Sequence, residues 1–550
     1  MRYLQKEAPK ELLDTLRVIE TQSDECFKGL RLLRMPRNQA VWTVLTNAVS
    51  RIEAEIAQYG DNSSRFDVLL INLSRLCTLE VEWIAKYGKP ASKLISKWNW
   101  SAVCQTSAEE ALQVANNYDG FLACFPMWHK DRCLAEALNQ TGARFTAVGD
   151  DRERQVSAYQ KGFRPGAGRF KSARAAKPEQ QHELQQLFST VLQTCEDKGK
   201  HRFLYPDPTE LWSALLPEYR TRVEGICRRA DSIDLGEYTL ADFKRFYVGL
   251  LAVCAAHEHL CYRWLQAGNE FPLDSAIMIK PRRRWARILA VITGLTARKS
   301  DCMVHDLTLG VTRSVNLHVH PFVPMDAHSE TLALAPQFPL HSCIDENILQ
   351  TCSRLRPSVY DAATLEKEEE MRSTLKEASR FRVEGPATLP KALPDVDLIV
   401  EDLPSSTVVI AEMKWARKPT RPIESVDRDS DVLKGIRQLG LIKGFLNENP
   451  DHLHAQGKLT NSLEGYQHVH FLLIARDHWL WIDTNDHVAI IEFDPFLRIL
   501  QNAEDLHVGI ADLLTYDWLP VEGRDFVVRY ERSIANGVVI ESQVFHPLGP

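Results

Sequence analysis

The sequence predicts a multidomain protein with a helix-rich and α/β N-terminal region, followed by a C-terminal α/β domain whose mixed central sheet is flanked by helices. Three observations predict this fold class. The chain has 550 residues, more than one average domain of about 150 residues holds. Its first hundred residues space apolar positions three and four apart, as in ELLDTLRVIETQ (11–22). From residue 361 onward, short apolar runs alternate with helical segments.

The composition is typical of a soluble globular protein, with 44% hydrophobic and 25% charged residues. The longest apolar stretch, Tyr247 to Ala256, is shorter than the roughly 20 residues that cross a bilayer. The charged N-terminus lacks the apolar centre of a signal peptide. We therefore expect a cytoplasmic protein without a membrane partner.

The twelve cysteines form no CxxC pair. This spacing argues against a zinc ribbon and against a small secreted disulfide framework. We expect most of them to be buried thiols.

Changes in sequence pattern divide the chain into five expected segments. They are a helical region (1–117), a small α/β unit (118–160), a basic loop or linker (161–178), a helical and mixed middle region (179–355) and the C-terminal domain with a β-hairpin (356–550). In the small unit, a strand predicted from the apolar run 120–125 is followed by a predicted helix at 130–142 that ends in glycine and another predicted strand at 143–149. Asn536-Gly537, between alternating apolar runs, predicts the hairpin.

Three local motifs resemble known sites but lack a defining feature. The segment 166–172 (GAGRFKS) has no Gly-Lys pair, which a phosphate-binding loop requires. Cys261 stands where the zinc-protease motif beginning at His257 needs its second histidine. His318 and His320 fall on one face of a predicted strand, and two histidines alone do not make a metal site. We expect structural roles for all three motifs.

The residues that predict chemistry lie in the C-terminal third. A helix (364–380) and a short strand (381–385) precede a strand opened by Asp397, a turn, and a strand that ends with Glu412 and Lys414. Strand alternation places Glu412 and Lys414 on one face and Met413 on the other. The hairpin then brings Asp397 beside them.

This grouping suits the hydrolysis of a phosphodiester. A divalent ion neutralises the phosphate and activates water, and Mg²⁺ prefers oxygen ligands such as one or two carboxylates. Asp397 and Glu412 are the predicted ligands of Mg²⁺ or Mn²⁺. The ammonium of Lys414 can orient the attacking water or stabilise the charge that develops.

The arrangement resembles the PD-(D/E)XK superfamily of restriction-endonuclease-like nucleases over about residues 361 to 500. Its signature is an Asp at the start of one core strand and ExK on the next, here Asp397 and the segment Glu412-Met413-Lys414. Asp397 directly precedes the apolar LIV run, as the ligand does in many relatives, whereas the Pro-Asp pair would select Asp395. The resemblance implies an endonuclease that acts on DNA rather than RNA.

Relatives often place a further Glu on the preceding helix, and Glu368 is the predicted one. Apolar residues follow it at three and seven positions and define the inward face. Glu369 and Glu370 are alternatives. The resemblance also implies that Gln438, on the helix after the ExK strand, reaches the site.

The chain contains a second ExK match, Glu196-Asp197-Lys198, around which no strands are predicted. The motif alone is therefore weakly specific. At Glu412 the motif closes an apolar strand paired with another. One alternative is an ordinary hairpin with solvated charges. Another is a nucleic-acid-binding or assembly protein with a catalytically inactive nuclease-like fold.

Basic residues predict where nucleic acid binds. Guanidinium groups hold phosphates and an indole stacks on a base. The candidates are Arg282, Arg283, Arg284, Trp285, Arg287, Arg417 and Lys418. The alternative for each is a solvated surface. The resemblance further implies that the N-terminal region supplies recognition, regulation or assembly with copies of the chain or an accessory protein, and that the protein serves anti-phage defence or restriction.

Overall fold

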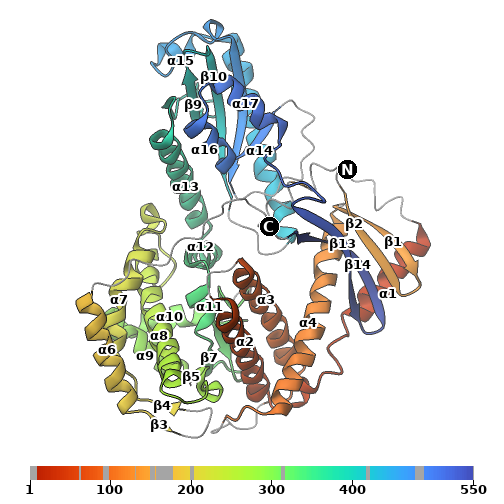
Figure 1. Ribbon diagram of the computed structural model, residues 1–550, viewed down its shortest axis with the longest axis vertical. Helices are drawn as coiled ribbons and strands as arrows, with labels where there is room; N and C mark the ends of the chain where they lie inside the picture. The colour runs from red at the N-terminus through yellow and green to blue at the C-terminus, as the bar shows by residue number, and fades with distance from the viewer. Residues whose placement is uncertain are drawn as a thin grey trace.

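The computed structural model describes residues 9–60, 64–90, 98–130, 132–148, 155, 178–197, 203–310, 316–416, 422–476 and 488–548. The protein is rich in helices and contains several separate sheets (Figure 1). The basic segment 161–177 lies outside the described residues, so the linker predicted there is untested. None of the described helices is long and apolar enough to cross a membrane.

Long helices at the N-terminus pack around a buried core. They are α2 (Arg37–Tyr59), α3 (Ser64–Tyr87) and α4 (Ala102–His129), with the 3₁₀ turn η1 (Arg31–Arg34) before α2, whereas α1 (Lys10–Ser23) packs against Phe121 and Phe125 of α4 in a separate cluster. Trp42 of α2 is fully buried in this core. Ala333 joins the same core from a three-stranded sheet, in which β7 (Thr331–Leu334) lies between β5 (Met278–Pro281) and β6 (Phe322–Pro324).

The middle region is helical and centred on α8 (Leu240–Gln266). Thr239 and Asp242 form a capping box at its start, which satisfies backbone N–H groups of the first turn. The other helices are α6 (Pro178–Gln193), α7 (Thr209–Glu224), α9 (Arg282–Thr293), α10 (Ala297–Asp306), α11 (Gln337–His341) and α12 (Ile344–Leu355), with the 3₁₀ turns η2 (Arg228–Ala230) and η3 (Leu273–Ser275) and the paired strands β3 (Glu196–Asp197) and β4 (Phe203–Leu204).

A five-stranded mixed sheet forms the C-terminal part, at the top of Figure 1, in the order β12-β11-β10-β9-β8. Its strands are β8 (Arg382–Glu384), β9 (Leu398–Asp402), β10 (Thr407–Trp415), β11 (His468–Arg476) and β12 (Ala489–Glu492). β8, β9 and β10 pair antiparallel, whereas β11 is parallel to both of its neighbours. The predicted mixed sheet is therefore confirmed.

Helices cover both faces of this sheet. On one face lie α13 (Pro357–Ala378), α16 (Phe493–Asn502) and α17 (Leu506–Thr515), and on the other lie α14 (Pro422–Glu448), the short α15 (His452–Ala455) and the turn η4 (Leu463–Gly465). Met413 and Met371 belong to the first core, and Ile410 and Ile442 to the second. Alternation along β10 thus separates the two layers.

The predicted hairpin at the C-terminus is confirmed. β13 (Phe526–Ala535) and β14 (Val538–Pro547) pair antiparallel, and Asn536 and Gly537 both have positive φ, which the tight hairpin turn requires. The hairpin does not extend the C-terminal sheet, however. β14 pairs in parallel with β2 (Gly142–Ala147) in a sheet of order β1-β2-β14-β13 (Figure 1). The C-terminal hairpin therefore joins strands from the first third of the chain.

Two element predictions in the small α/β unit are wrong. Residues 120–125 continue helix α4, and the stretch predicted as a helix at 130–142 contains strand β1 (Cys133–Asn139) instead. The strand forms because β1 pairs with β2 over its length, and this pairing outweighs the helix propensity of its Ala, Leu and Glu residues. The strand predicted at 143–149 is confirmed in β2.

The strand predicted around His318 and His320 is also wrong, because residues 317–319 form a turn. The Asn316 side chain accepts hydrogen bonds from the backbone N–H groups of His318 and Val319, and such asparagine turns compete with extended structure. Both histidines are buried, which lowers the pKa of His318 to about 3 and that of His320 to about 4.

Candidate active site at the ends of strands β9 and β10

The register of the β9–β10 pair sets the geometry of the candidate site. The last paired residues are Leu398 and Ala411, so Asp397 and Glu412 are the next pair along the two strands. Side chains of Ile399 and Ile410 point to the α14 layer, and period-two alternation places Asp397, Glu412 and Lys414 on that same face. The predicted shared face is confirmed.

Asp397 is held from two directions. Its Oδ2 accepts a hydrogen bond from the backbone N–H of Met413 at 2.9 Å. Its own carbonyl oxygen accepts one from Arg372 Nε at 2.9 Å. Gly385, at φ +139°, passes so close that a Cβ there would lie 2.5 Å from that carbonyl. The position of Asp397 is therefore fixed by its neighbours on β10, α13 and the segment after β8.

Asp395, the alternative first ligand, lies elsewhere. Its side chain is exposed, and its Oδ1 accepts a hydrogen bond from the backbone N–H of Leu389 at 3.2 Å. It thereby stabilises the loop before β9. The structure brings Asp397 to Glu412 and leaves Asp395 outside the cluster.

Glu412 and Lys414 form a close ion pair, with Lys414 Nζ 2.5 Å from Glu412 Oε1. The Glu412 side chain is only 2% exposed. Its second oxygen, Oε2, is buried, and no described residue donates a hydrogen bond to it. The Lys414 side chain lies against Gly435 of α14, where a Cβ would come within 3.3 Å of Lys414 Cε. One carboxylate oxygen is therefore buried and unsatisfied, which is costly.

The electrostatics of the cluster favour an added cation. Burial and the nearby Asp397 raise the pKa of Glu412 to about 7, against the opposing effect of Lys414. Burial also raises the pKa of Asp397, although the Met413 N–H, Lys414, Arg372 and a hydrogen bond with the Glu412 carboxyl group lower it. Burial lowers the pKa of Lys414, but attraction to Glu412 outweighs this effect, so the net shift is upward. When both are ionised, the buried Glu412 and the half-buried Asp397 repel each other, and one ammonium only partly compensates.

Glu368 of α13 joins the cluster. Its Oε1 accepts a hydrogen bond from the backbone N–H of Trp415 at 3.4 Å. Burial raises its pKa to about 7, with Lys414 lowering and Asp397 raising it. These interactions place Glu368 next to both residues.

The two neighbouring glutamates do not join it. Glu369 pairs with Arg372, and Glu370 pairs with Lys367 at 2.8 Å. Of the three predicted alternatives on this helix, the structure brings only Glu368 to the end of β10.

Gln438 lies on α14, three residues after Gly435, so the two residues share one side of the helix. Gly435 is the residue that touches Lys414. The Gln438 Oε1 atom is buried without a hydrogen-bond partner among the described residues. Gln438 therefore lies one helical turn from the Lys414 contact.

Arg372 is the residue that sequence reasoning missed. It follows Glu368 by four residues on α13, so both face the same side of the helix. Its guanidinium binds the Asp397 carbonyl and the Glu369 carboxylate. The i,i+4 spacing from Glu368 is the signal that could have found it.

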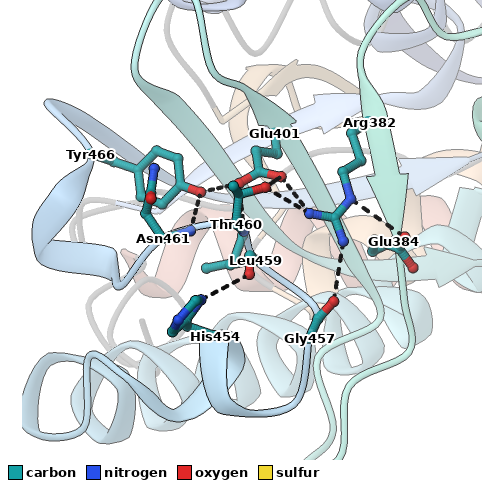
Figure 2. Close-up of polar contacts among 9 residues, drawn as sticks. All are labelled: Arg382, Glu384, Glu401, His454, Gly457, Leu459, Thr460, Asn461 and Tyr466. Atoms are coloured by element: carbon teal, nitrogen blue, oxygen red, sulfur yellow. Dashed lines mark hydrogen bonds and ion pairs between the residues drawn. The ribbon is translucent and has the colours of Figure 1, made fainter.

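A buried carboxylate further along the sheet provides a comparison. Glu401, near the far end of β9, accepts hydrogen bonds from Thr460 N and Oγ1 and from Arg382, each at 2.8 Å, and from the Tyr466 hydroxyl (Figure 2). Burial alone would raise its pKa, but Tyr466 and the other donors outweigh this and lower it. Arg382 also donates to Gly457 O at 3.1 Å, so the network ties the loop before η4 to the sheet. Glu401 is saturated with donors, whereas Glu412 is not.

The predicted nucleic-acid-binding cluster on α9 is partly wrong. The Trp285 side chain is fully buried, and its Nε1 donates to Leu332 O at 3.2 Å, so the indole cannot stack on a base. Arg282 forms an ion pair with Asp301, and Arg284 forms one with Asp207. The remaining candidates are exposed or outside the described residues: Arg283 and Arg287 are exposed, and Arg417 and Lys418 are not described.

The second ExK match has a different setting. Glu196 and Asp197 form the two-residue strand β3, contrary to the expectation that no strand accompanies this motif. The strand pairs only with β4 and is not part of the five-stranded sheet. Lys198 lies outside the described residues.

The carboxylates of this cluster are the candidate ligands for a metal ion. Across the described ranges, no group of three or more His, Cys, Asp and Glu side chains is arranged to hold a metal ion. Mg²⁺ and Mn²⁺ need fewer protein ligands, because water and substrate phosphate complete their coordination. Asp397 and Glu412 supply such a pair, and the unsatisfied Oε2 of Glu412 and the repulsion between the carboxyl groups fit a divalent cation.

Comparison with protein-family models, with curated proteins and with solved structures gave no match to this chain, so the site stands on its own geometry.

Proposed function

We propose that this protein is a Mg²⁺- or Mn²⁺-dependent nuclease of the PD-(D/E)XK type that hydrolyses phosphodiester bonds, with DNA as the substrate. The observation that carries the proposal is the contrast between two buried glutamates of neighbouring strands. Glu401 receives four hydrogen bonds, whereas Glu412 keeps a buried oxygen without a described donor beside Asp397. A buried carboxylate left unsatisfied by the fold is typical of a ligand-binding position.

The side chains have distinct roles in this proposal. Asp397 and Glu412 would hold the divalent ion, which when bound supplies charge neutralisation at the phosphate and lowers the pKa of water. Lys414, two residues after Glu412 on the same face of β10, would donate hydrogen bonds to the attacking water or to the phosphate oxygens.

Two further residues act on the proton balance and the geometry. Glu368, with a pKa of about 7, can accept a proton from water near neutral pH. Arg372 is a positioning residue, because it contacts the backbone of Asp397 and not its carboxylate.

A cleavage assay tests the proposal. The purified chain is incubated with supercoiled plasmid, single-stranded DNA and RNA in Mg²⁺, Mn²⁺ or EDTA. We expect metal-dependent cleavage of DNA that Glu412→Gln and Lys414→Met each reduce by at least about 100-fold, the scale of a lost catalytic group. Asp395→Asn is the matched control, because Asp395 lies two residues from Asp397 but outside the cluster.

Wild-type protein that cleaves none of these substrates in either metal, while it still binds DNA, would indicate a binding or assembly role for an inactive nuclease-like fold. We also propose a role in anti-phage defence or restriction, and recognition of partners by the N-terminal region. Both proposals depend on the detection of cleavage.

A further inference from the structure

A cavity of about 350 Å³ lies in the middle region, between α7, α8, η2 and α9. This volume is at the lower end of the range for small-molecule sites, about 300 to 1,000 Å³. Part of its wall is apolar, formed by Leu216, Val223, Val248 and Ile292. The cavity is remote in sequence from the residues of the candidate active site.

The rest of the lining is charged, and cations dominate it. Arg220, Arg228, Lys244 and Arg245 stand against only two carboxylates, Glu224 and Asp231. The whole chain has a formal net charge of −7, so this local excess of positive charge runs against the average. Clefts lined by one sign of charge concentrate ligands of the opposite sign.

Lys244 is the buried member of this set. Its side chain is 5% exposed, and its Nζ lies 2.5 Å from Asp231 Oδ1 and 3.5 Å from the carbonyl oxygen of Glu224. An ammonium has three donors, and among the described residues Glu224 O accepts one of them, while the contact with Asp231 is an ion pair without a hydrogen bond. The remaining donors are available to a molecule in the cavity.

The arginines at the rim are weakly engaged. Arg245 lies 3.8 Å from Asp242, and Arg220 lies 3.5 Å from Glu224, both at the long end for an ion pair. Arg228, on η2, forms no ion pair with any residue that the structure describes. Planar guanidinium groups of this kind bind phosphate oxygens in pairs.

We propose that this cavity binds a small organic phosphate, with the phosphate at Lys244, Arg228 and Arg245 and an apolar or aromatic body against Val223, Val248 and Ile292. The size of the cavity favours a molecule such as a mononucleotide over a nucleic acid, because a duplex cannot enter a space of about 350 Å³. Inorganic phosphate would contact the charged residues and leave the apolar part of the cavity unfilled.

The turn η2, which contributes Arg228 to the cavity, also contacts the helix that carries Glu368. The backbone N–H of Arg229, next to Arg228, donates to the Glu366 carboxylate on α13. Cys227 donates its Sγ–H to Val359 O of the same helix at 3.9 Å. An effect of the ligand on cleavage would use this contact, and that consequence rests on the proposed function, whereas binding itself does not.

Calorimetric titration tests the binding. The full chain in low salt and EDTA is titrated with inorganic pyrophosphate, AMP and ATP. We expect saturable binding of at least one nucleotide with one site per chain, weakened tenfold or more in the double variant Arg228→Gln/Arg245→Gln. Both arginines are exposed, so their replacement leaves the fold intact, which a melting curve verifies.

Two controls make the result decisive. Arg222→Gln, on α7 but outside the cavity, removes one positive charge by the same substitution and should leave binding unchanged. Glu412→Gln should also leave binding unchanged, which separates this site from the candidate active site. No binding of any probe to wild type, or an equal loss in Arg222→Gln or Glu412→Gln, would overturn the inference whether or not the protein is a nuclease.

Discussion

Asp397 Oδ2 accepts a hydrogen bond from the backbone N–H of Met413 at 2.9 Å, so the residue that precedes β9 is tied to the centre of the ExK segment on β10. Because Met413 lies between Glu412 and Lys414, this one bond sets the distance between the first carboxylate and the other two side chains. The cluster is therefore formed by the backbone pairing of two strands, and it does not depend on a flexible loop.

Replacing Asp397 with Asn should separate chemistry from structure. The amide oxygen can still accept the Met413 N–H, so the fold should be retained, whereas a neutral amide is a poor ligand for Mg²⁺. We expect the cleavage rate to fall at least about 100-fold with a change in Tm of less than about 3 °C. Asp397→Ala, which also removes the hydrogen bond, should cost about 1 kcal/mol of stability in addition. Cleavage by Asp397→Asn at the wild-type rate would exclude Asp397 as a ligand.

Glu412→Gln should stabilise the metal-free protein at alkaline pH. The folded-state pKa of Glu412, about 7, lies above the ordinary pKa of a glutamate, 4.5, so the folded protein binds the proton more tightly than the unfolded chain does. The free energy of unfolding of the wild type therefore falls as pH rises from about 4.5 to about 7. The variant lacks this loss and should be more stable by about 1 to 3 kcal/mol at pH 8, with little difference at pH 4.5.

The same pair of proteins tests the metal. Mg²⁺ relieves the repulsion between Asp397 and Glu412, so it should raise the Tm of the wild type at pH 8 more than that of Glu412→Gln. Denaturant unfolding at both pH values with and without Mg²⁺ measures these differences. A variant that is less stable than wild type at pH 8 without metal would show that Glu412 is a structural residue like Glu401.

Glu401→Gln should have the opposite effect. The donors around Glu401 lower its pKa, so its stabilising contribution is present above the unfolded pKa and is lost as pH falls through the folded value. Removing the charge weakens the bonds to Arg382 and leaves a mismatched amide against Tyr466 and Thr460. We expect a loss of about 2 to 4 kcal/mol at pH 7. A urea unfolding curve at pH 7 that matches wild type would refute the anchoring role.

Much of the candidate site could be predicted because it depends on short-range patterns. Alternation with period two placed Glu412 and Lys414 on one face, and helical spacing selected Glu368 on α13. Both patterns act within one element or one hairpin. The choice of Asp397 over Asp395 needed the strand register, which the sequence pattern left open.

The partners of distant segments could not be predicted in this way. The Asn536-Gly537 turn specifies a hairpin, but nothing local indicates that Val539 pairs with Gly142 almost 400 residues earlier. Residues 133–139 have helix-forming side chains, but they form a strand because they pair with β2 at the edge of that sheet. Trp285 follows three arginines and reads as a surface residue, yet α9 turns it into the core, where it packs on Phe322.

Two glycines of α14 offer a matched test of whether helix α14 positions Lys414. At Gly440 nothing lies within 4 Å of an added Cβ, so Gly440→Ala should stabilise the helix by about 0.5 to 1 kcal/mol. At Gly435 the added methyl meets Leu473 Cδ1 at 2.9 Å and Lys414 Cε at 3.3 Å, so Gly435→Ala should displace the Lys414 side chain from Glu412. We expect cleavage to fall about tenfold or more in Gly435→Ala and to stay at the wild-type rate in Gly440→Ala, with both proteins folded. The comparison isolates the contact, because the two variants make the same chemical change on the same helix. Equal activity in the two variants would contradict the inference that the contact with Gly435 positions the Lys414 ammonium for the proposed reaction.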